Sequence, residues 1–506
     1  MSRLLLRLLL GLLLLVALTA AACRFFLPER YAVNAPLAHM LLGRGREAPP
    51  PDQVGALLTV PDGLAVELWA SGLPNARFLR ITPLGDVLVS LPRSGRVVLV
   101  ERERDGRAGA VRTLLEGLDR PHGIDLHEGW LYVGETGAVV RVRFDPAQRR
   151  TEGPIERVVE GLPAGGNHWT RTVRFGPDGW MYVSVGSSCN VCTEDDPRRA
   201  AILRFRPDGS DGEIFATGLR NSVGLAWRPA DGALYATDNG RDLLGDDLPP
   251  CELNRIEAGG FYGWPFAYGD RVPDPDLGAG REAEIAGSIP PVHAFRAHNA
   301  PLGITFLESE RWPAALRGAA VVALHGSWNR TRKDGYRVVS LHWGADGAIE
   351  ERPFLSGFLR GEEVLGRPVD VAEGPDGELF VSDDYAGALY RVRVLAEGEA
   401  APAAAPAPRA STAPPSSGSE APIAPEAVAR GRALYAAHDC ARCHDPERAE
   451  PGVVPVRLDP EALRARHDVA SLAAWLRAPT PPMPAVALAE PERRDLAAFL
   501  LAGALD

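Results

Sequence analysis

Short apolar runs separated by turn residues dominate the chain between about residues 61 and 395. Six of these runs have the same character: Val87–Val89, Leu131–Val133, Met181–Val183, Leu234–Ala236, Val321–Ala323 and Leu379–Val381. Asp-Gly precedes three of them, at Asp178, Asp231 and Asp376, and Asp-Gly between apolar runs is a strong β-hairpin signal. A Gly-hydrophobic step recurs five times, at Gly72, Gly117, Gly161, Gly218 and Gly357. The pattern predicts one unit of several strands that repeats six times.

Repeats of this kind, spaced by roughly 40–60 residues, are typical of a β-propeller with four-stranded blades. One interval is longer and holds an insertion at about 240–295 that is rich in Gly, Pro and Asp. A β-sandwich with irregular loops is the alternative, but it gives no reason for the same motif order to recur. We therefore expect an all-β, six-bladed propeller over 61–395, with function on the face where loops from every blade converge.

The N-terminus has the pattern of an export signal. Two arginines, Arg3 and Arg7, precede an apolar stretch from Leu8 to Ala22, which is short for a membrane span of about 20 residues. Residues 1–22 are expected to be a signal peptide, and the Ala-Ala-Ala-Cys ending at Cys23 is similar to the site at which bacterial lipoproteins are cleaved and lipidated. Ordinary cleavage and an uncleaved anchor are the alternatives. The expectation is a periplasmic or extracytoplasmic protein, anchored to the membrane through Cys23.

The remaining segments have different compositions. Residues 23–60 contain Pro-rich stretches and are predicted to be a tether with one short helix. Residues 396–425 are rich in Ala, Pro and Ser, which is typical of a semi-extended linker. Residues 426–506 have helical periodicity, with amphipathic segments at 469–476 and 493–501.

The strongest chemical motif is Cys440-Ala-Arg-Cys443-His444, a C-x-x-C-H sequence that indicates covalent attachment of haem c. Two thiols one helical turn apart bond the haem vinyl groups, and the following His faces the iron. Met483, in a loop with Pro on both sides, is the expected second ligand, and His/Met ligation suits electron transfer. A core-filling role is the alternative for Met483. These features resemble the cytochrome c family, which implies a small all-α domain after the propeller.

Charge and cysteine content narrow the picture further. The 506 residues carry a formal charge of −11, which argues against general nucleic-acid binding. Six cysteines are too few for a disulfide scaffold. Cys189 and Cys192 form a second C-x-x-C without a following His, so a disulfide or a two-cysteine metal site is expected there. Cys251 has no role that the sequence indicates.

Four polar segments of the expected propeller occur in a specific order: Gly166-Asn167-His168-Trp169, Gly218-Leu219-Arg220-Asn221, Tyr262-Gly263-Trp264-Pro265 and His325-Gly326-Ser327-Trp328-Asn329-Arg330. Over about 60–395 this order resembles the soluble, pyrroloquinoline quinone (PQQ)-dependent sugar dehydrogenases of the glucose/sorbosone type. The last segment and Ser188-Cys-Asn-Val-Cys192 are closer to the aldose and sorbosone branch. Members of this family have six blades.

The resemblance implies roles for three polar residues. His168 would be the general base that removes the proton of a sugar hydroxyl, which suits the near-neutral pKa of imidazole. Arg220 would polarise the quinone oxygen where negative charge develops, and Asn221 would hold the cofactor beside it. His122, His298 and His325 are the competing histidines.

The resemblance also implies a calcium ion and two anchoring arginines. The backbone carbonyls of Gly240 and Arg241 would bind a Ca2+ that also contacts the quinone, because hard cations take oxygen ligands. Arg330 and Arg367 would pair with the cofactor's carboxylates, for which the planar fork of Arg is apt. Arg332 and Lys333 are alternatives to Arg330.

The sequence therefore predicts an exported quinohaemoprotein dehydrogenase. It would oxidise an aldose or sorbosone-like sugar by hydride transfer to PQQ and pass the electrons through haem c to a downstream cytochrome, quinone or oxidase. A calcium-dependent propeller hydrolase of the lactonase type is one alternative, and a non-enzymatic binding propeller with an electron-relay haem is another. Bound PQQ would separate the three.

Overall fold

The structure is a computed structural model that describes residues 29–36, 45–396, 399, 424–444, 458, 463, 469–476 and 488–502. The chain divides into two compact units, Met1–Pro408 and Arg409–Asp506. The predicted signal segment, Cys23 and Met483 lie outside the described residues.

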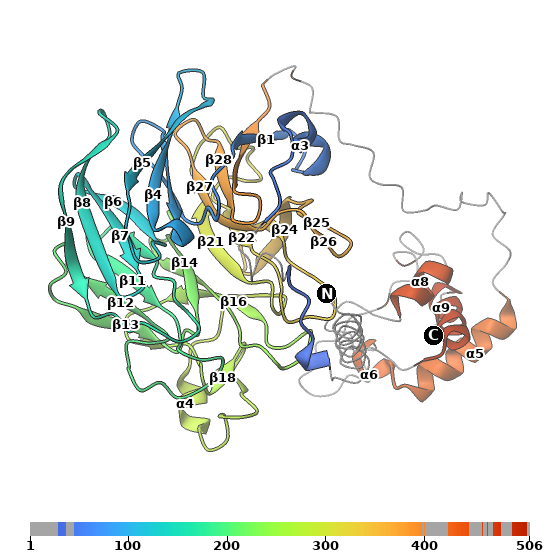
Figure 1. The fold of residues 1–506 in the computed structure, drawn as a ribbon. Helices are drawn as coiled ribbons and strands as arrows, with labels where there is room; N and C mark the ends of the chain where they lie inside the picture. Colours follow the sequence, from blue (N-terminus) through green and yellow to red (C-terminus); the bar gives the residue numbers. More distant parts are fainter. Residues whose placement is uncertain are drawn as a thin grey trace, which may run out of the picture. The chain divides into compact units, whose positions relative to one another are not determined.

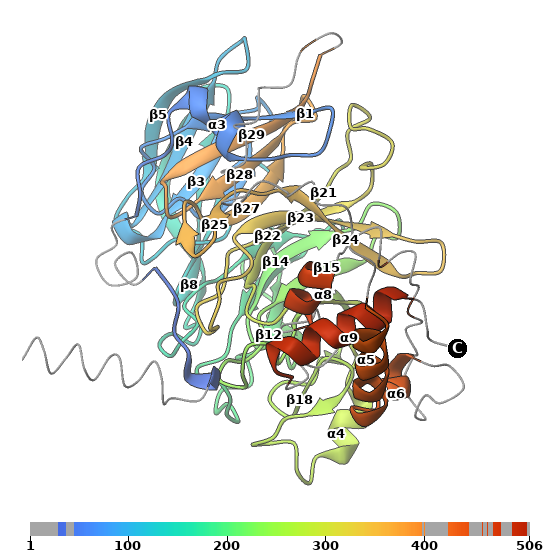
Figure 2. The same cartoon turned by 90° about the vertical axis from the view of Figure 1, so that its right-hand side faces the viewer.

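Six mainly antiparallel sheets succeed one another around the first unit (Figures 1 and 2). The first three blades contain β2 (Leu79–Ile81), β3 (Val87–Leu91), β4 (Arg96–Arg102) and β5 (Ala108–Leu115); β6 (Ile124–His127), β7 (Trp130–Glu135), β8 (Ala138–Asp145) and β9 (Arg150–Glu160); and β10 (Val173–Phe175), β11 (Met181–Val185), β12 (Ala201–Phe205) and β13 (Glu213–Thr217). The last three contain β14 (Ser222–Trp227), β15 (Leu234–Asp238), β16 (Cys251–Ile256) and β20 (His293–Phe295); β21 (Pro301–Phe306), β22 (Ala320–Leu324), β23 (Arg337–Trp343) and β24 (Ile349–Leu355); and β27 (Pro368–Glu373), β28 (Leu379–Asp383), β29 (Ala388–Val394) and β1 (Leu64–Ala70).

The six-bladed propeller predicted from the repeats is confirmed, and the β-sandwich is excluded. Each of the six recurring apolar runs is the second strand of its blade, and each predicted Asp-Gly turn joins the first strand of a blade to the second. The first strands line the centre, since β21 packs against β14 and β27, and β2 packs against β27 and β6. Every residue of β3, β11, β15, β22 and β28 is buried. Both faces of these strands are covered by neighbouring blades, which explains their continuous apolar runs.

The ring closes by pairing the two ends of the propeller sequence. β1 pairs antiparallel with β29 and completes the last blade, as Leu64 opposite Val394 shows. Before β1, helix α3 (Pro51–Leu57) buries Val54 in the apolar cluster shared by blades five and six, and Thr59 bridges to Ser356. The end of the segment predicted as a tether is thus part of the packed propeller.

The insertion in the fourth blade adds small elements at one edge. β17 (Gly260–Phe261) joins the third blade in parallel with β13, while the hairpin β18 (Ala267–Tyr268) to β19 (Val272–Pro273) and helix α4 (Glu282–Gly287) lie at the lower edge in both views (Figures 1 and 2). Three further short elements complete the described propeller unit: η1 (Glu29–Tyr31), η2 (Pro92–Ser94) and the hairpin β25 (Leu359–Arg360) to β26 (Glu363–Val364).

The second unit contains the helices α5 (Pro425–Ala437), α6 (Ala441–His444), α8 (Val469–Trp475) and α9 (Glu490–Ala502). α5 packs on α9, where Gly431 lies so close to the backbone of Asp495 that a side chain there would clash. The rings of Tyr435 and Phe499 are 5.5 Å apart across the same interface. Among the described residues, no helix has both the length and the apolar character that crossing a membrane requires.

Two tryptophans provide a test of this packing. Trp312 is fully buried between blades and its indole N–H donates to Glu373, whereas Trp328 is 39% exposed. Trp312→Ala is expected to lower the free energy of unfolding by about 3–5 kcal/mol, because a large cavity is left in a close-packed core. Trp328→Ala is the matched control and should change it by less than about 1 kcal/mol. Equal effects of the two substitutions in urea unfolding would contradict the assigned core.

Candidate functional site

The residues predicted for the quinone site lie at one end of the propeller. Because neighbouring strands run antiparallel, the segment entering each first strand and the loop between the second and third strands lie at the same end. We call this end the site face. It carries all seven predicted positions: His168 before β10, Arg220 and Asn221 before β14, Gly240 and Arg241 after β15, Arg330 after β22, and Arg367 before β27.

His168 is held as a neutral base. Its Nδ1 lies 2.9 Å from the carbonyl oxygen of Ser187, and a carbonyl only accepts, so Nδ1 carries the proton and Nε2 keeps the lone pair. Burial, followed by the positive charge of Arg220, lowers the pKa of His168 to about 3. The imidazole is therefore uncharged at neutral pH, and its residue is only half-buried, so Nε2 is available to a ligand.

The three competing histidines are less suited to that role. His122 is fully buried against the ring of Phe78, and Nε2 of His298 donates to the carbonyl of Gly245. His325 is buried, with Nε2 3.1 Å from the carboxylate of Asp384. Among the described histidines of the site face, His168 combines partial exposure with an unbonded ring nitrogen.

Arg220 is fixed by the loop between Cys189 and Cys192. Its Nε donates to the backbone oxygen of Asn190 and its Nη2 to the side-chain oxygen of the same residue, both at 2.9 Å. The Nη1 atom of Arg220 donates to the carbonyl oxygens of Asn239, at 3.2 Å, and Gly240, at 2.9 Å. Asp242 pairs with Nη2 at 3.2 Å. A buried guanidinium is thus held by oxygen atoms on several sides.

A disulfide closes the loop that contacts Arg220 and Ser187, the hydrogen-bond partner of His168. Cys189 and Cys192 are bonded to each other, so neither supplies a thiolate to the metal site considered as an alternative, although Glu194 lies beside them. The carbonyl of Cys189 accepts a hydrogen bond from Ser187, the partner of His168. Cys251 is a free, buried cysteine at the start of β16.

Asn221 and His168 meet at Gly186. A Cβ atom at position 186 would lie 2.6 Å from both the side-chain oxygen of Asn221 and Cβ of His168. Only glycine at position 186 therefore leaves room for both side chains beside the backbone. The side-chain oxygen of Asn221 is buried without a hydrogen-bond partner in the described part of the chain, which leaves an acceptor for a ligand.

The two predicted calcium carbonyls have different surroundings. The Gly240 oxygen accepts a hydrogen bond from Arg220, which leaves one of its two lone pairs. The side chain of Arg241 forms a buried ion pair with Asp274, at 2.7 Å, and a second pair with Asp276. These ion pairs fix the loop that presents both carbonyls.

The two predicted anchoring arginines lie in separate networks. Arg330 donates to the backbone of Asp246 and, at 3.2 Å, to that of Ala297, so it braces the loop that follows Gly240. The two alternatives to Arg330 also have other partners. Lys333 donates a hydrogen bond to Asn34, and the Arg332 side chain, which is 85% exposed, lies beside Glu362.

Arg367 belongs to a buried charged cluster formed by residues of blades five, six and one. Its Nη2 lies 3.0 Å from Nδ1 of His325, and Asp384 binds Arg77 at 2.9 Å. Burial alone would raise the pKa of Asp384, but Arg367, His325 and Arg77 hold it well below its usual value. Arg77, Asp384 and the loop residue Asn190 were not predicted. Only the cysteines beside Asn190 pointed to its loop, and no spacing in the sequence relates residue 77 to residue 384.

In the second unit, the C-x-x-C-H segment at 440–444, which is predicted to attach haem, forms one helical turn. α6 begins directly after Cys440, and the backbone N–H of His444 donates to the carbonyl of Cys440 at 3.1 Å. The side chain of Cys443 lies outside the described part of the structure.

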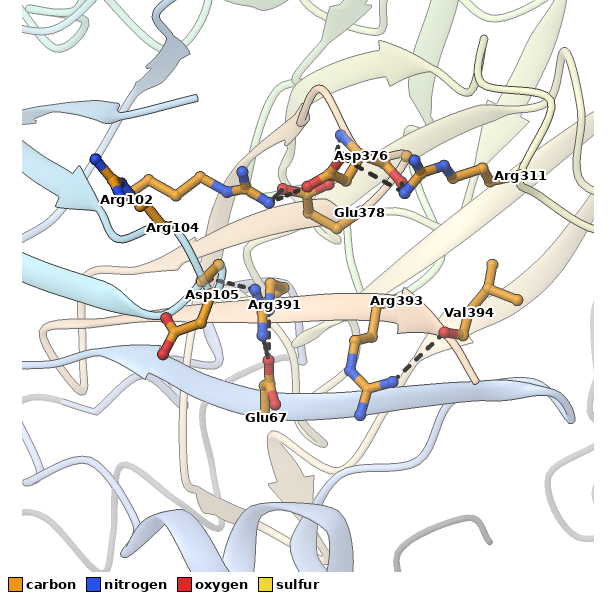
Figure 3. A pocket seen from close by; sticks show the side chains of 12 residues that line it. Glu67, Arg102, Arg104, Asp105, Arg311, Asp376, Glu378, Arg391, Arg393 and Val394 are labelled. Carbon is orange, nitrogen blue, oxygen red and sulfur yellow. Dashed lines mark hydrogen bonds and ion pairs between the residues drawn. The ribbon is translucent and has the colours of Figure 1, made fainter. Parts of the chain in front are cut away.

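A charged pocket lies at the end of the propeller opposite the site face (Figure 3). It has a volume of about 520 Å³ and is lined by the turns β4–β5 and β27–β28, which the strand order places away from the site face. Arg102 pairs with Asp376, and Arg391 pairs with Glu67, as Figure 3 shows. Both arginines are paired with carboxylates, and none of the residues predicted for the quinone site lines this pocket.

The chain is similar in sequence to several known proteins. A family model described as Glucose / Sorbosone dehydrogenase matches residues 131–391. An aldose sugar dehydrogenase of Escherichia coli is 27% identical over 244 residues, which are 45% of this chain and 60% of that protein. A pyrroloquinoline quinone-dependent pyranose dehydrogenase of Coprinopsis cinerea is 24% identical over 413 residues, 66% of this chain and 54% of that protein. The chain thus spans less than two thirds of either relative.

The fold itself also has solved counterparts. A calcium structure of a Trichoderma reesei protein of carbohydrate-active enzyme family AA12 superposes with a TM-score of 0.59 at 22% identity. The superposition covers 67% of this chain and 98% of that one. It supports the propeller architecture.

A buried carboxyl beneath the site gives a pH-dependent prediction. Burial, followed by the neighbouring Glu252, raises the pKa of Asp238 to about 8, against about 3.9 in an unfolded chain. Between these values the folded state keeps a proton that the unfolded state has lost, so stability should fall as pH rises from about 4 to 8. Asp238→Asn removes this titration and should flatten the profile of unfolding free energy measured in urea. The exposed turn residue Asp346, changed to Asn, is the control, and an unchanged slope in Asp238→Asn would contradict the assignment.

Proposed function

Since this chain belongs to the glucose/sorbosone dehydrogenase family, we propose that it is an exported, PQQ-dependent dehydrogenase that oxidises an aldose or sorbosone-like sugar and transfers the electrons to haem c. The proposed sugar chemistry draws on the E. coli aldose sugar dehydrogenase and the Coprinopsis cinerea pyranose dehydrogenase among its relatives. The observation that carries the proposal is the geometry of His168, whose Nδ1 donates to the Ser187 carbonyl and so leaves the Nε2 lone pair to accept a proton.

The residues of the site face suit an oxygen-rich, anionic quinone. The buried oxygen of Asn221 lacks a partner in the described chain and is an acceptor that a cofactor would satisfy. Arg367 lines a cavity of about 490 Å³, within the range of roughly 300–1,000 Å³ for small-molecule sites. Asn221 and Arg367 would hold the cofactor, with Arg220 beside its reacting oxygen. When bound, PQQ supplies a two-electron acceptor for hydride.

His168 would perform the proton transfer. Its Nε2 accepts the proton of the sugar hydroxyl at C1 while the C1 hydrogen leaves with two electrons, so an aldose is converted to its lactone. The hydrogen bond from Nδ1 to Ser187 keeps the ring in the required tautomer. Arg220 would stabilise the negative charge that develops on the quinone oxygen, and its burial strengthens this electrostatic interaction.

Calcium is proposed at the carbonyls of Gly240 and Arg241. Both are hard oxygen ligands of the type that Ca2+ takes, and the ion pairs of Arg241 with Asp274 and Asp276 hold the loop in place. Because Arg220 already donates to the Gly240 oxygen, the ion would use the second lone pair.

Export and haem attachment are proposed from the sequence. The N-terminal signal with Cys23, and the C-x-x-C-H motif, suit an exported protein whose electrons leave singly through haem c. His444 would be the proximal ligand of the haem iron and Met483 the distal one. The backbone hydrogen bond from His444 to Cys440, which closes a helical turn over the motif, supports this proposal.

Reconstitution with PQQ and Ca2+ is the direct test of the enzyme. Aldoses should then reduce a dye acceptor, and His168→Ala should lower kcat/KM by about 100-fold or more, because general-base catalysis contributes 10²–10⁴. His342→Ala, a half-buried histidine on β23, is the matched control and should leave the rate unchanged. Lactone hydrolysis without PQQ reduction would instead favour the hydrolase, and an absence of both reactions would favour a binding propeller.

The haem is tested separately from the sugar chemistry. The double variant Cys440→Ser/Cys443→Ser should lose covalently bound haem in a pyridine haemochrome assay, while dye-linked sugar oxidation stays within about twofold, because the propeller is a separate compact unit. Arg442→Ala, at the exposed position between the two cysteines, is the control and should keep the haem. Wild-type protein without covalent haem, after expression with a haem-attachment system, would refute this part of the proposal.

A further inference from the structure

One pocket of the site face has an excess of positive charge. The cavity of about 490 Å³ beside Trp169 is lined by Arg77, Arg93, Arg120 and Arg367, against the single carboxylate of Asp384. The chain as a whole has a net charge of −11, so this local excess is opposite in sign to the rest of the protein. A concave positive patch concentrates anionic ligands at its surface.

Two of these arginines interact with a carboxylate of the protein itself. Arg77 and Arg367 have side chains that are only 10% and 16% exposed, and both lie against Asp384. They form the buried part of the cavity, where Arg367 is proposed to hold the cofactor.

Arg120 differs from them in exposure and partners. It is exposed, and among the described residues it has neither a hydrogen-bond acceptor nor an ion-pair partner. The carboxylate of the preceding Asp119 acts on its charge only beyond ion-pair distance. All five N–H donors of this guanidinium are therefore available to a ligand.

The position of Arg120 is nevertheless fixed. Its guanidinium lies over the indole of Trp169, 4.1 Å from the ring centroid, and its backbone has a φ of +50°, which non-glycine residues rarely adopt. Strained residues persist where the surroundings hold them, and they cluster at ligand sites. Because Trp169 directly follows His168, the unpartnered cation is tied to the residue next to the base.

We propose that Arg120, supported by Trp169, is a carboxylate-binding subsite for the end of the sugar remote from C1, so that the preferred substrates are hexuronic acids. The planar fork of an arginine matches a carboxylate in bidentate fashion. A hexuronic acid has that carboxylate at C6 and keeps the C1 hydroxyl that His168 would deprotonate. The inference rests on the proposed sugar oxidation. It assigns the exposed Arg120 to the substrate and leaves the buried Arg367 to the cofactor.

The test compares D-glucuronate with D-glucose, which differ only at C6, in the PQQ- and Ca2+-reconstituted protein. Wild type should have a higher kcat/KM for glucuronate, mainly through a lower KM, and the preference should weaken with added NaCl. Arg120→Gln should reduce kcat/KM for glucuronate about tenfold and leave glucose within about twofold. Arg143→Ala is the matched control, because Arg143 also lies over an indole, 4.0 Å from the Trp130 ring, on β8.

Calorimetric titration of glucuronate and of PQQ distinguishes the remaining outcomes. Weaker PQQ binding in Arg120→Gln, with both sugars affected alike, would assign Arg120 to the cofactor and overturn the proposal. Equal kcat/KM values for the two sugars in wild type would also overturn it. If no sugar is oxidised although PQQ binds, the proposed dehydrogenase fails. The subsite is then decided by whether glucuronate binds in an Arg120-dependent manner.

Discussion

The pairing of β1 with β29 is the interaction on which the rest of the propeller depends. It joins the first strand of the repeat region to the last, so six otherwise sequential blades become a closed ring. Closure supplies the last blade with its outer strand and covers β28, whose five residues are all buried. It also places loops that are far apart in sequence around one axis, which is why Arg77, near the start of the propeller, ion-pairs with Asp384 near its end.

The site face is stabilised by buried charges that compensate one another. Arg220 is held by Asn190 and Asp242, Arg241 by Asp274, and Asp384 by Arg77 and Arg367. Breaking one member of such a pair costs more than the pair contributes, because a lone charge would stay buried. These pairs hold the charged side chains of the site face in place. It also means that a substitution in these pairs acts on stability and on chemistry at once.

The sequence was sufficient for the fold because the blade repeat is local. An apolar run with Asp-Gly before it, as at Met181 and Leu379, encodes a buried second strand whatever lies elsewhere in the chain. The segment before β1 was harder, since most of the cluster that buries Val54 comes from residues more than 250 positions later, such as Trp312 and Phe358. Pro-rich composition alone gave no sign of that contact.

Only part of the candidate site could be predicted from the sequence. His168, Arg220 and Asn221 lie in motifs that resemble a known family, and they are neighbours in space around Gly186 and Ser187. The contact of Asn190 with Arg220 could not be predicted, because the two residues are 30 positions apart and meet only in the folded chain. Arg330 is predicted to contact the cofactor, and its hydrogen bonds to the 246–247 loop are a further contact that sequence spacing does not encode. The role of Arg120 likewise depends on the indole that it covers.

The bond between Cys189 and Cys192 links the assembly of the site to the redox state of its surroundings. The four-residue loop that it closes holds Asn190 against Arg220 and presents the Cys189 carbonyl to Ser187. Disulfides persist where thiols are oxidised and are rare in reducing compartments. Under reducing conditions the chain would therefore lack the covalent restraint on this loop, and the positions of Asn190 and of the Cys189 carbonyl would depend on noncovalent contacts alone.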